Sequence, residues 1–355
     1  MADKARPVAL VGDSALLDEL LRLAAGAGCE LERVPDALAL RACWKDAPLI
    51  LLDERSAFAC RALDLPRRPA VYLVGTQPPA ASCWPEAVAL GVERVVELPA
   101  ASEWLVSALA DQAEGPPSTE GRVLALLGGR GGAGASVLAA AVGQAVLATG
   151  GHGLLIDCDP LGGGIDLTLG AESDDGLRWP ALHLSGGRVA ASALHSALPG
   201  RTGKRGRLTV LSCDRDGQGP GSDAVAAVVE AGRRAGETVV CDLPRQLTDS
   251  ACAALDRSDL AVLVVPAEVR ACAAAQQVAH RVSERGVNIR MVVRGPAPGG
   301  LRGEQIADVV GIPLLATMRP EPGLAAALDR GRFPESARGP LARAARSVLA
   351  VLREH

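Results

Sequence analysis

A glycine-rich loop carries the strongest chemical signal in this sequence of 355 residues. Gly129 and Gly134 have the spacing of a phosphate-binding loop, and Ser136 stands where a hydroxyl would reach Mg²⁺. Backbone N–H groups of such a loop curl around phosphate oxygens, and the positive end of the following helix adds to the attraction. The residues predicted to bind the phosphate are Gly129, Arg130, Gly131, Gly132, Ala133, Gly134, Ala135 and Ser136.

The loop lacks the lysine that this spacing normally carries. Ala135 directly precedes Ser136, at the position where an ammonium group would neutralise phosphate charge. The glycines are still needed, because a Cβ would block the approach of an anion to the backbone. The pattern therefore predicts the shape of a phosphate site without its main charge. The alternative is a strand-to-helix turn that binds nothing.

Three aspartates follow predicted strands. Asp157 and Asp159 come at the end of one apolar run, and Asp242 ends another. Ligands of open α/β sheets bind at the carboxyl ends of the strands, where these carboxylates are expected. Each aspartate alone is more typical of a helix cap or a turn. Their order after the glycine loop favours one shared site, in which Asp242 would hold a Mg²⁺-bound water.

Apolar runs that alternate with amphipathic ones must position these residues. From residue 122 onward we predict strands over 123–127, 153–157, 208–212, 238–242, 260–266, 288–294 and 313–317. Helices are predicted over 134–149, 221–235, 249–256, 270–285, 303–310, 321–330 and 338–353, with a short one near 190–198. This alternation is typical of a doubly wound parallel sheet. The apolar segment 133–149 is predicted as a buried crossover helix, not a membrane span.

An earlier block of the chain repeats the alternation. Strands are predicted over 8–12, 49–53, 71–75 and 94–98, with a helix over 16–27. Two prolines and two glycines without apolar periodicity mark a linker over 114–121. We therefore predict one α/β domain over 1–113 and a second over 122–355.

The second domain resembles the MinD/ParA group of deviant-Walker P-loop ATPases. Within it, the CpaE/TadZ branch and the actinobacterial septum-site-determining proteins are most similar. The matching segments are 130–136 for the family's loop KGGxGKT, 157–162 for its DxDPQG-like segment, 239–244 for its Walker B strand, and two further stretches over 263–270 and 311–333. The resemblance covers about 122–355 and implies a P-loop NTPase fold that binds ATP and Mg²⁺.

The resemblance also implies roles for single residues. Arg130 stands at the signature-lysine position, which reaches across an ATP-sandwich dimer. Ser136 would supply the Mg²⁺ hydroxyl and Asp242 the outer-shell acid of the metal. Asp159 would be the catalytic carboxylate that orients the attacking water.

The loop departs from the family pattern at both of its lysines. Arg130 and Ala135 replace them, and Arg294 stands where the family often has an adenine-reading Asn. We therefore predict weak or absent ATP turnover, which leaves enzyme activity uncertain.

The first domain resembles a response-regulator receiver, which has a flavodoxin-like doubly wound fold. Asp53 falls at the phosphoacceptor position and Thr76 at the receiver's hydroxyl position. Asp13 is all that remains of the acidic pair, and Leu98 replaces the lysine. We predict a pseudo-receiver that docks partners; the alternative is a phosphorylated switch.

Composition limits the classes of function. With 48% hydrophobic and 22% charged residues the chain is predicted to fold, and a net charge of −4 with 2% aromatics argues against nucleic-acid binding. The basic cluster 201–207 is predicted as a solvated loop, with DNA contact as the alternative. Nine Cys without a CxxC pair indicate reduced thiols in the cytoplasm. The amphipathic segment 340–353 is predicted to pack in the core, with a membrane anchor as the alternative.

The sequence thus predicts a cytoplasmic, homodimeric MinD-like localisation regulator, recruited to a pole or septum. Division-site or pilus-secretion proteins would dock on the receiver-like domain, in septum-site determination or in placement of a Tad/Flp pilus machine. Peripheral membrane association is left open, and no specific nucleic-acid partner is expected. The alternatives are an active MinD/ParA-type ATPase with a hydrolysis-driven cycle and a ParA-like DNA-associated partitioning protein.

Overall fold

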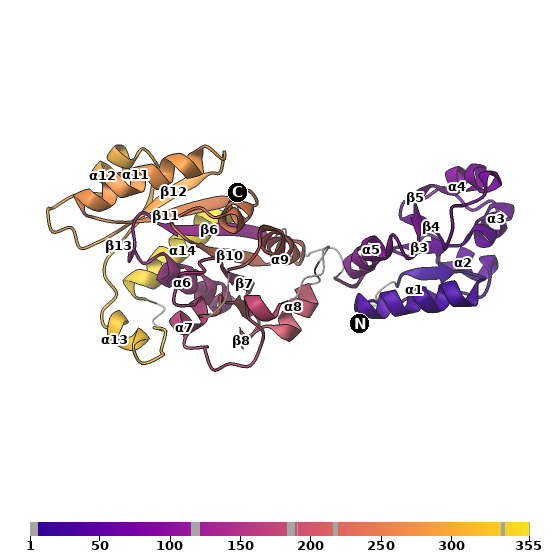
Figure 1. The fold of residues 1–355 in the computed structure, drawn as a ribbon, viewed down its shortest axis with the longest axis horizontal. Coiled ribbons are helices and arrows are strands. Elements are labelled where there is room, and N and C mark those ends of the chain that lie inside the picture. The colour runs from indigo at the N-terminus through magenta and orange to yellow at the C-terminus, as the bar shows by residue number, and fades with distance from the viewer. Residues whose placement is uncertain are drawn as a thin grey trace. The chain divides into compact units, whose positions relative to one another are not determined.

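The computed structural model describes residues 6–114, 121–182, 189, 191–215, 219–334 and 338–354. The chain divides into two compact units, Met1–Pro116 and Pro117–His355 (Figure 1). The predicted linker 114–121 falls mainly on residues 115–120, which lie outside the described ranges.

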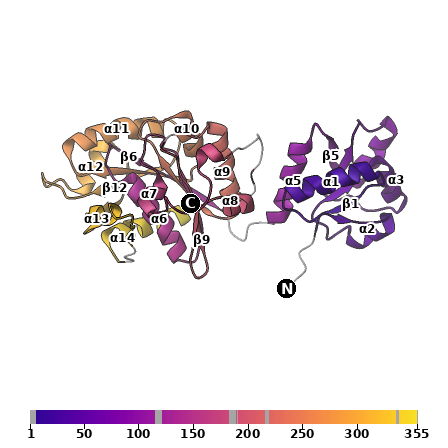
Figure 2. The same ribbon diagram turned by 60° about the horizontal axis from the view of Figure 1, so that its bottom comes forward.

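The first unit is a five-stranded parallel sheet in the order β2-β1-β3-β4-β5. This is the strand order of flavodoxin-like folds. Strands β1 and β5 and helices α1, α2, α3 and α5 of this unit can be followed in Figure 2. Its elements are β1 (Val8–Leu10), α1 (Ser14–Gly26), β2 (Glu32–Arg33), α2 (Ala37–Cys43), β3 (Ile50–Leu52), α3 (Glu54–Ala62), β4 (Val71–Gly75), η1 (Ala81–Cys83), α4 (Trp84–Leu90), β5 (Val92–Glu97) and α5 (Ser102–Glu114).

Aspartates start the first three helices of this unit. The side chains of Asp13, Asp36 and Asp53 each accept backbone N–H groups from the first turn of α1, α2 and α3. A capping carboxylate satisfies donors that the helix leaves unpaired and matches the positive end of its dipole. Each helix therefore begins directly after a strand or a short turn.

The second unit is an eight-stranded sheet in the order β13-β12-β11-β6-β10-β7-β9-β8. All pairings are parallel except that of β8 with β9. Its elements are β6 (Arg122–Gly128), α6 (Ala135–Ala148), β7 (His152–Asp157), α7 (Ile165–Leu169), η2 (Trp179–Ala181), α8 (Ala191–Ala197), β8 (Gly200–Thr202), β9 (Arg207–Leu211), α9 (Ser222–Arg234), β10 (Thr238–Leu243), α10 (Asp249–Leu255), β11 (Leu260–Pro266), α11 (Val269–Ser283), β12 (Ile289–Arg294), α12 (Gly303–Val310), β13 (Leu314–Met318), α13 (Leu324–Leu328) and α14 (Pro340–Arg353).

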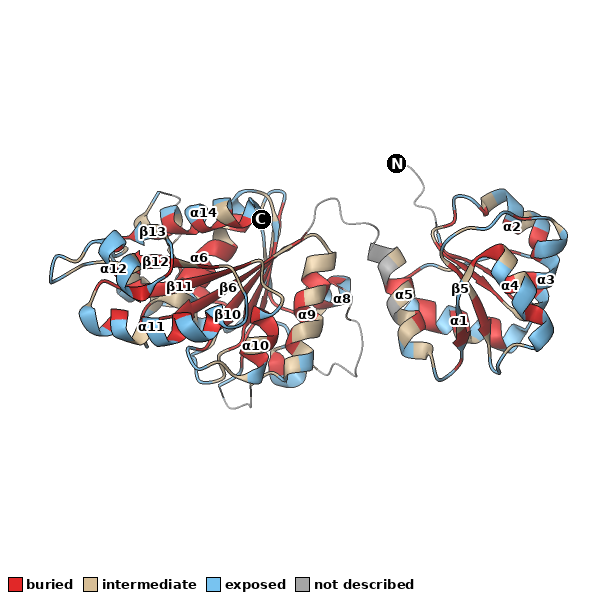
Figure 3. Ribbon diagram, turned by 90° about the horizontal axis from the view of Figure 1, so that it is seen from above, coloured by how far each residue is buried: buried red, intermediate tan, exposed pale blue. Residues whose placement is uncertain are grey.

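Helices cover both faces of this second sheet. Figure 3 shows buried central strands with α6 and α14 on one face and α9, α10 and α11 on the other. The central strand β11 is buried along its whole length, as strands covered on both faces must be. The prediction of a doubly wound α/β fold for both domains is confirmed.

The apolar helix α6 and the amphipathic helix α14 pack against each other. Half of α6 is buried, and Leu341, Val348 and Leu349 of α14 lie in the same apolar cluster. The core interpretation of segment 340–353 is thus confirmed for its apolar face. Among the described residues, no helix is long and apolar enough to cross a membrane.

Local sequence missed two edge strands. The strand β2 has two exposed residues, and β8 pairs antiparallel beside β9. Neither carries an apolar run, because an edge strand has one neighbour and buries less surface. The helix predicted over 321–330 is shorter, spanning Leu324–Leu328, and the short helix near 190–198 is present as α8.

Candidate functional site

The strand order gathers the predicted site residues at one edge of the second sheet. Strands β11, β6, β10 and β7 are consecutive neighbours, and the glycine loop follows β6. Asp242 near the end of β10 pairs in register with Asp157 at the end of β7. The loop, Asp242 and the Asp157–Asp159 pair therefore lie together at the carboxyl ends of adjacent strands, where open α/β sheets bind ligands.

The glycine loop has a backbone shape that other residues would strain. Gly132 and Gly134 have φ values of +69° and +95°, a region that Cβ-bearing residues rarely adopt. A Cβ added to Gly131 or Gly132 would meet no described atom within 4 Å, so the outer side of the loop is open. The helix α6 begins at Ala135 and points its N-terminal N–H groups at this open side.

A buried carboxylate lies beneath the loop. Asp242 is only 4% exposed, and Ser136 lines the same cavity. Burial raises the pKa of Asp242 well above its ordinary value, and repulsion from Asp157 and Asp159 adds to the effect, while the nearby Ser136 hydroxyl opposes it. A nearby cation would remove this penalty, because it favours the ionised form.

Asp157 organises the segment that carries Asp159. Its carboxylate accepts N–H groups of Asp159 at 3.0 Å, Ile165 at 2.9 Å and Cys213 at 3.2 Å. Burial raises the pKa of Asp157 in spite of these three hydrogen bonds. The sequence placed Asp157 at the shared site without a role of its own, and its bonds make it the support that sets the position of Asp159.

A cavity of about 230 Å³ opens between these groups. Its lining includes Ser136, Asp159 and Asp242, together with the backbone of Gly162 and Gly163. A hydroxyl and carboxylates are the hard oxygen donors that Mg²⁺ prefers, with phosphate oxygens completing its shell. Within the described ranges no group of three or more His, Cys, Asp or Glu forms a metal site by itself. The residues present thus fit a metal that arrives with a phosphate ligand.

Arg130 forms an ion pair inside its own chain. Its Nη2 donates to Glu268 Oε1 at 2.9 Å, and both side chains are over one-third exposed. Glu268 follows β11, the neighbour of β6, so the pair closes across adjacent strand ends. The Nε of Arg130 has no partner among the described residues. Glu268 received no role from the sequence, although this residue lies in the family-matching segment 263–270 just after an apolar strand.

Arg294 also reaches the loop. A Cβ added to Gly134 would lie 3.2 Å from Arg294 Nη1. From the family resemblance, Arg294 replaces an Asn that often reads adenine. Its position beside the glycines of the loop was not predicted.

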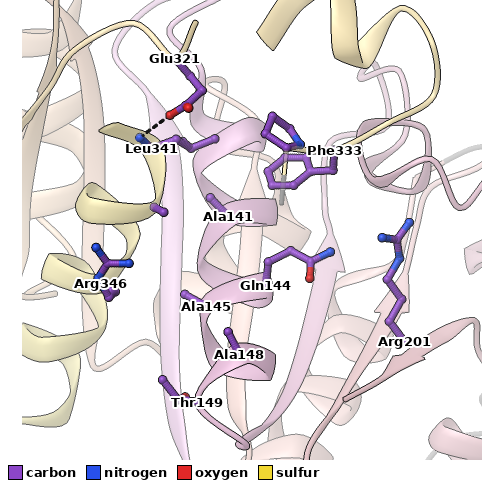
Figure 4. A pocket seen from close by; sticks show the side chains of 12 residues that line it. Ala141, Gln144, Ala145, Ala148, Thr149, Arg201, Glu321, Phe333, Leu341 and Arg346 are labelled. Atoms are coloured by element: carbon purple, nitrogen blue, oxygen red, sulfur yellow. Dashed lines mark hydrogen bonds between the residues drawn. The ribbon is translucent and has the colours of Figure 1, made fainter. Parts of the chain in front are cut away.

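A second cavity of about 230 Å³ lies between α6 and α14 (Figure 4). Its floor is Ala141, Ala145 and Ala148, and Arg201 and Arg346 stand at opposite sides. The Glu321 carboxylate accepts the Leu341 N–H at 2.9 Å and so caps α14. This cavity shares no lining residue with the strand-end cavity.

The basic cluster 201–207 is only partly the solvated loop that the sequence indicated, because Lys204 and Arg205 are exposed whereas Arg201 and Arg207 are half-buried. It forms β8, a turn and the start of β9. Arg201 donates to the carbonyl of Leu169, and Arg207 donates to the carbonyl of His195. The interpretation is wrong for these two side chains, because backbone carbonyls distant in sequence bind them. They are correspondingly less available to phosphates of DNA.

Both carboxylate oxygens of Asp53 in the first unit accept backbone hydrogen bonds. One carboxylate oxygen accepts the Ser56 N–H at 2.8 Å, and the other accepts the Gly12 N–H at 2.7 Å. Asp13 caps α1 through Ala15 N and Leu16 N. Both acids thus hold backbone N–H groups, which weakens either as a ligand for Mg²⁺.

We expect Asp53 to resist phosphorylation. Its oxygens are already hydrogen-bonded, and buried Leu98 supplies no ammonium to stabilise a phosphoryl group. Incubating the protein with a small phosphodonor and Mg²⁺ should leave its intact mass unchanged. A mass increase of one phosphoryl group that disappears in Asp53→Asn would contradict the pseudo-receiver interpretation.

Sequence comparison finds relatives for the chain. Residues 10–120 match a family described as Rv3660c-like, CheY-like N-terminal domain. A protein described as uncharacterized protein Rv3660c, from Mycobacterium tuberculosis strain H37Rv, is 45% identical over 346 residues, which are 97% of each chain.

Solved structures match the second unit's fold. The MinC:MinD cell division protein complex of Aquifex aeolicus matches with a TM-score of 0.54 at 24% identity, over 66% of this chain and 96% of that one. A ParA family ATPase of Chlorobium tepidum gives 0.53 at 14% identity, over 66% and 99%. Septum site-determining MinD of Pyrococcus horikoshii, complexed with Mg-ADP, gives 0.50 at 18% identity, over 64% and 94%. The predicted MinD/ParA-like P-loop fold is therefore confirmed, beside a receiver-like first domain.

Proposed function

Because the chain belongs to the Rv3660c-like family and its second unit has the MinD/ParA fold, we propose that it is a nucleotide-binding localisation regulator of the MinD kind. It positions a division septum or a Tad/Flp pilus-secretion machine. The observation that carries the proposal is the open glycine loop beside a cavity that Ser136 and Asp242 line together. That arrangement offers backbone donors to phosphate and oxygen donors to a metal at one place.

The proposed ligands are ATP and Mg²⁺; one fold neighbour is described as a complex with Mg-ADP. Backbone N–H groups of 129–136 would hold the phosphates, and Ser136 with Asp242 would hold the metal. Asp159 lines the same cavity, where its carboxylate would orient water. The phosphates of a bound nucleotide and the buried carboxylates are both negative. A metal cation between them would offset both charges.

Partners are proposed to dock on the first unit. Trp84 and Val88 lie one turn apart on α4 and are 49% and 64% exposed, and Phe58 on α3 is 40% exposed. Large apolar side chains that remain exposed on a surface favour protein contacts. Division-site or pilus-secretion proteins at a pole or septum are the proposed occupants. Recovery of one class or the other with the tagged protein from native cells separates the two roles.

The nucleotide state is proposed to control a homodimer formed through the loop face. The Arg130 side chain is 38% exposed at the loop, where its Nη2 pairs with Glu268. An arginine fork can bind phosphate or carboxylate oxygens of a second copy.

We expect Arg130→Ala to weaken self-association about tenfold or more in the presence of Mg-ATP, because a charge pair at an interface is lost. Glu268→Gln should strengthen association, since it releases Arg130. Sedimentation velocity of the full chain, with and without Mg-ATP, measures both. Arg281→Ala, which removes an exposed arginine at the far end of α11, is the matched control.

Two results would overturn this part of the proposal. One is a wild-type protein that stays monomeric with and without Mg-ATP. The other is an Arg130→Ala variant that dimerises as tightly as the wild type.

A further inference from the structure

A cation from another strand lies against the phosphate loop. The Cβ position of Gly134 is 3.2 Å from Arg294 Nη1 and 3.7 Å from Arg294 Cδ, so the arginine packs on the residue just before Ala135. Arg294 ends β12, which is separated from β6 by β11. Its side chain therefore crosses the end of β11 to reach the loop.

This placement brings two positive groups together. The helix α6 starts at Ala135, and its first N–H groups carry the positive end of the helix dipole. Within the part of the chain that the structure describes, no carboxylate or carbonyl binds the Arg294 guanidinium. A guanidinium beside a helix N-terminus is repelled by it. The arrangement becomes favourable when one anion binds both the Arg294 guanidinium and the N-terminus of α6.

Arg130 is less suited to serve that anion. Its guanidinium is paired with Glu268 at 2.9 Å, so a carboxylate already offsets its charge. Arg294 is partly buried and has no such partner among the described residues. The sequence pattern alone indicates Arg130 as the side-chain cation of the loop. The structure adds a second cation, Arg294, which lies 160 residues after Gly134 in the chain.

We propose that Arg294 supplies the side-chain cation of the phosphate site, in place of the lysine that position 135 lacks. It binds phosphate oxygens of a nucleoside di- or triphosphate held by the loop. The inference rests on the proposed nucleotide-binding function. The planar guanidinium can donate two parallel hydrogen bonds to a phosphate, which an ammonium cannot.

The test compares binding of Mg-ADP, Mg-ATP and inorganic triphosphate to the full-length protein by calorimetry. Arg294→Ala should weaken the binding of all three ligands about tenfold or more, because the hydrogen bonds from the guanidinium to the charged phosphate oxygens are lost. Arg302→Ala removes an exposed arginine of the same domain and should bind like the wild type. Thermal unfolding of each variant reports that the fold is intact.

A double variant separates lost charge from lost structure. Adding Ala135→Lys to Arg294→Ala places an ammonium in the loop itself and should restore most of the binding. Inorganic triphosphate separates phosphate binding from a contact with the base, since a guanidinium can also stack on a purine ring.

Each contrary result has a distinct meaning. A wild type that binds neither nucleotide nor triphosphate overturns the proposed function together with this inference. Nucleotide binding that is equally tight in the wild type and in Arg294→Ala overturns the inference alone. Loss of nucleotide binding with unchanged triphosphate binding assigns Arg294 to the base and also overturns it.

Discussion

Replacing Ala135 with lysine is expected to raise the rate of ATP hydrolysis about 100-fold or more above a very slow wild-type rate. Phosphoryl transfer is catalysed mainly by positioning and by charge that stabilises the transition state. Removing a single preorganised donor of this kind typically costs about 100- to 1,000-fold in rate. The wild-type loop lacks the donor at 135, and its Arg130 is paired with Glu268.

Single-turnover hydrolysis by the full chain in excess over ATP measures the effect. Ala135→Met has a side chain of similar length without the charge, so it should stay as slow as the wild type. Asp159→Ala in the lysine background should lose the gain, since Asp159 lines the cavity beneath the loop. A wild type that already turns over rapidly, depends on Asp159 and gains nothing from the lysine would instead support an active ATPase cycle.

Replacing Asp242 with asparagine is expected to stabilise the protein without ligand at neutral and alkaline pH. Burial raises the pKa of Asp242 in the folded state, so ionising it there costs more than in the unfolded chain. Stability linked to this group is fully present below the unfolded pKa, about 3.9, and is lost as the pH rises toward the folded pKa. Asparagine carries no charge and has nearly the same shape as aspartate.

The advantage of Asp242→Asn should therefore be near zero at about pH 4 and grow as the pH rises. Its expected size is on the order of 1 kcal/mol or more, because a tenfold change in proton affinity equals about 1.4 kcal/mol. Urea unfolding at several pH values measures it, with the exposed Asp308→Asn as a control that should show no such trend. A variant that is less stable than the wild type at pH 8 would argue against a strained buried carboxylate.

Both predictions describe one property of the site. Burial raises the pKa of Asp157 and of Asp242, and repulsion among Asp157, Asp159 and Asp242 adds to the effect when no cation is bound. Sites that bind metal and phosphate commonly accept such a cost in stability, because the same charges bind the ligand.

Local sequence was enough to predict the fold class and to predict that the loop and the aspartates lie at one edge of the sheet. The loop over 129–136 and the aspartates after strands are signals carried by residues a few positions apart, and strand–helix alternation forces them to one edge of a parallel sheet. The same holds for the receiver-like domain, where Asp13 and Leu98 already indicated a missing acid and a missing ammonium. Spacing alone predicts these features because they depend on chain order and backbone conformation.

Only the tertiary structure decided which charges meet at the loop. Glu268 lies 138 residues after Arg130, and Arg294 lies 160 residues after Gly134, yet both reach it. Their positions follow from the order β12-β11-β6, which no local pattern encodes. Arg201 and Arg207 likewise turned inward to carbonyls that the chain brings back from other segments. A long charged side chain pairs with whatever group lies within its reach, and that is set by strand order and packing rather than by its neighbours in sequence.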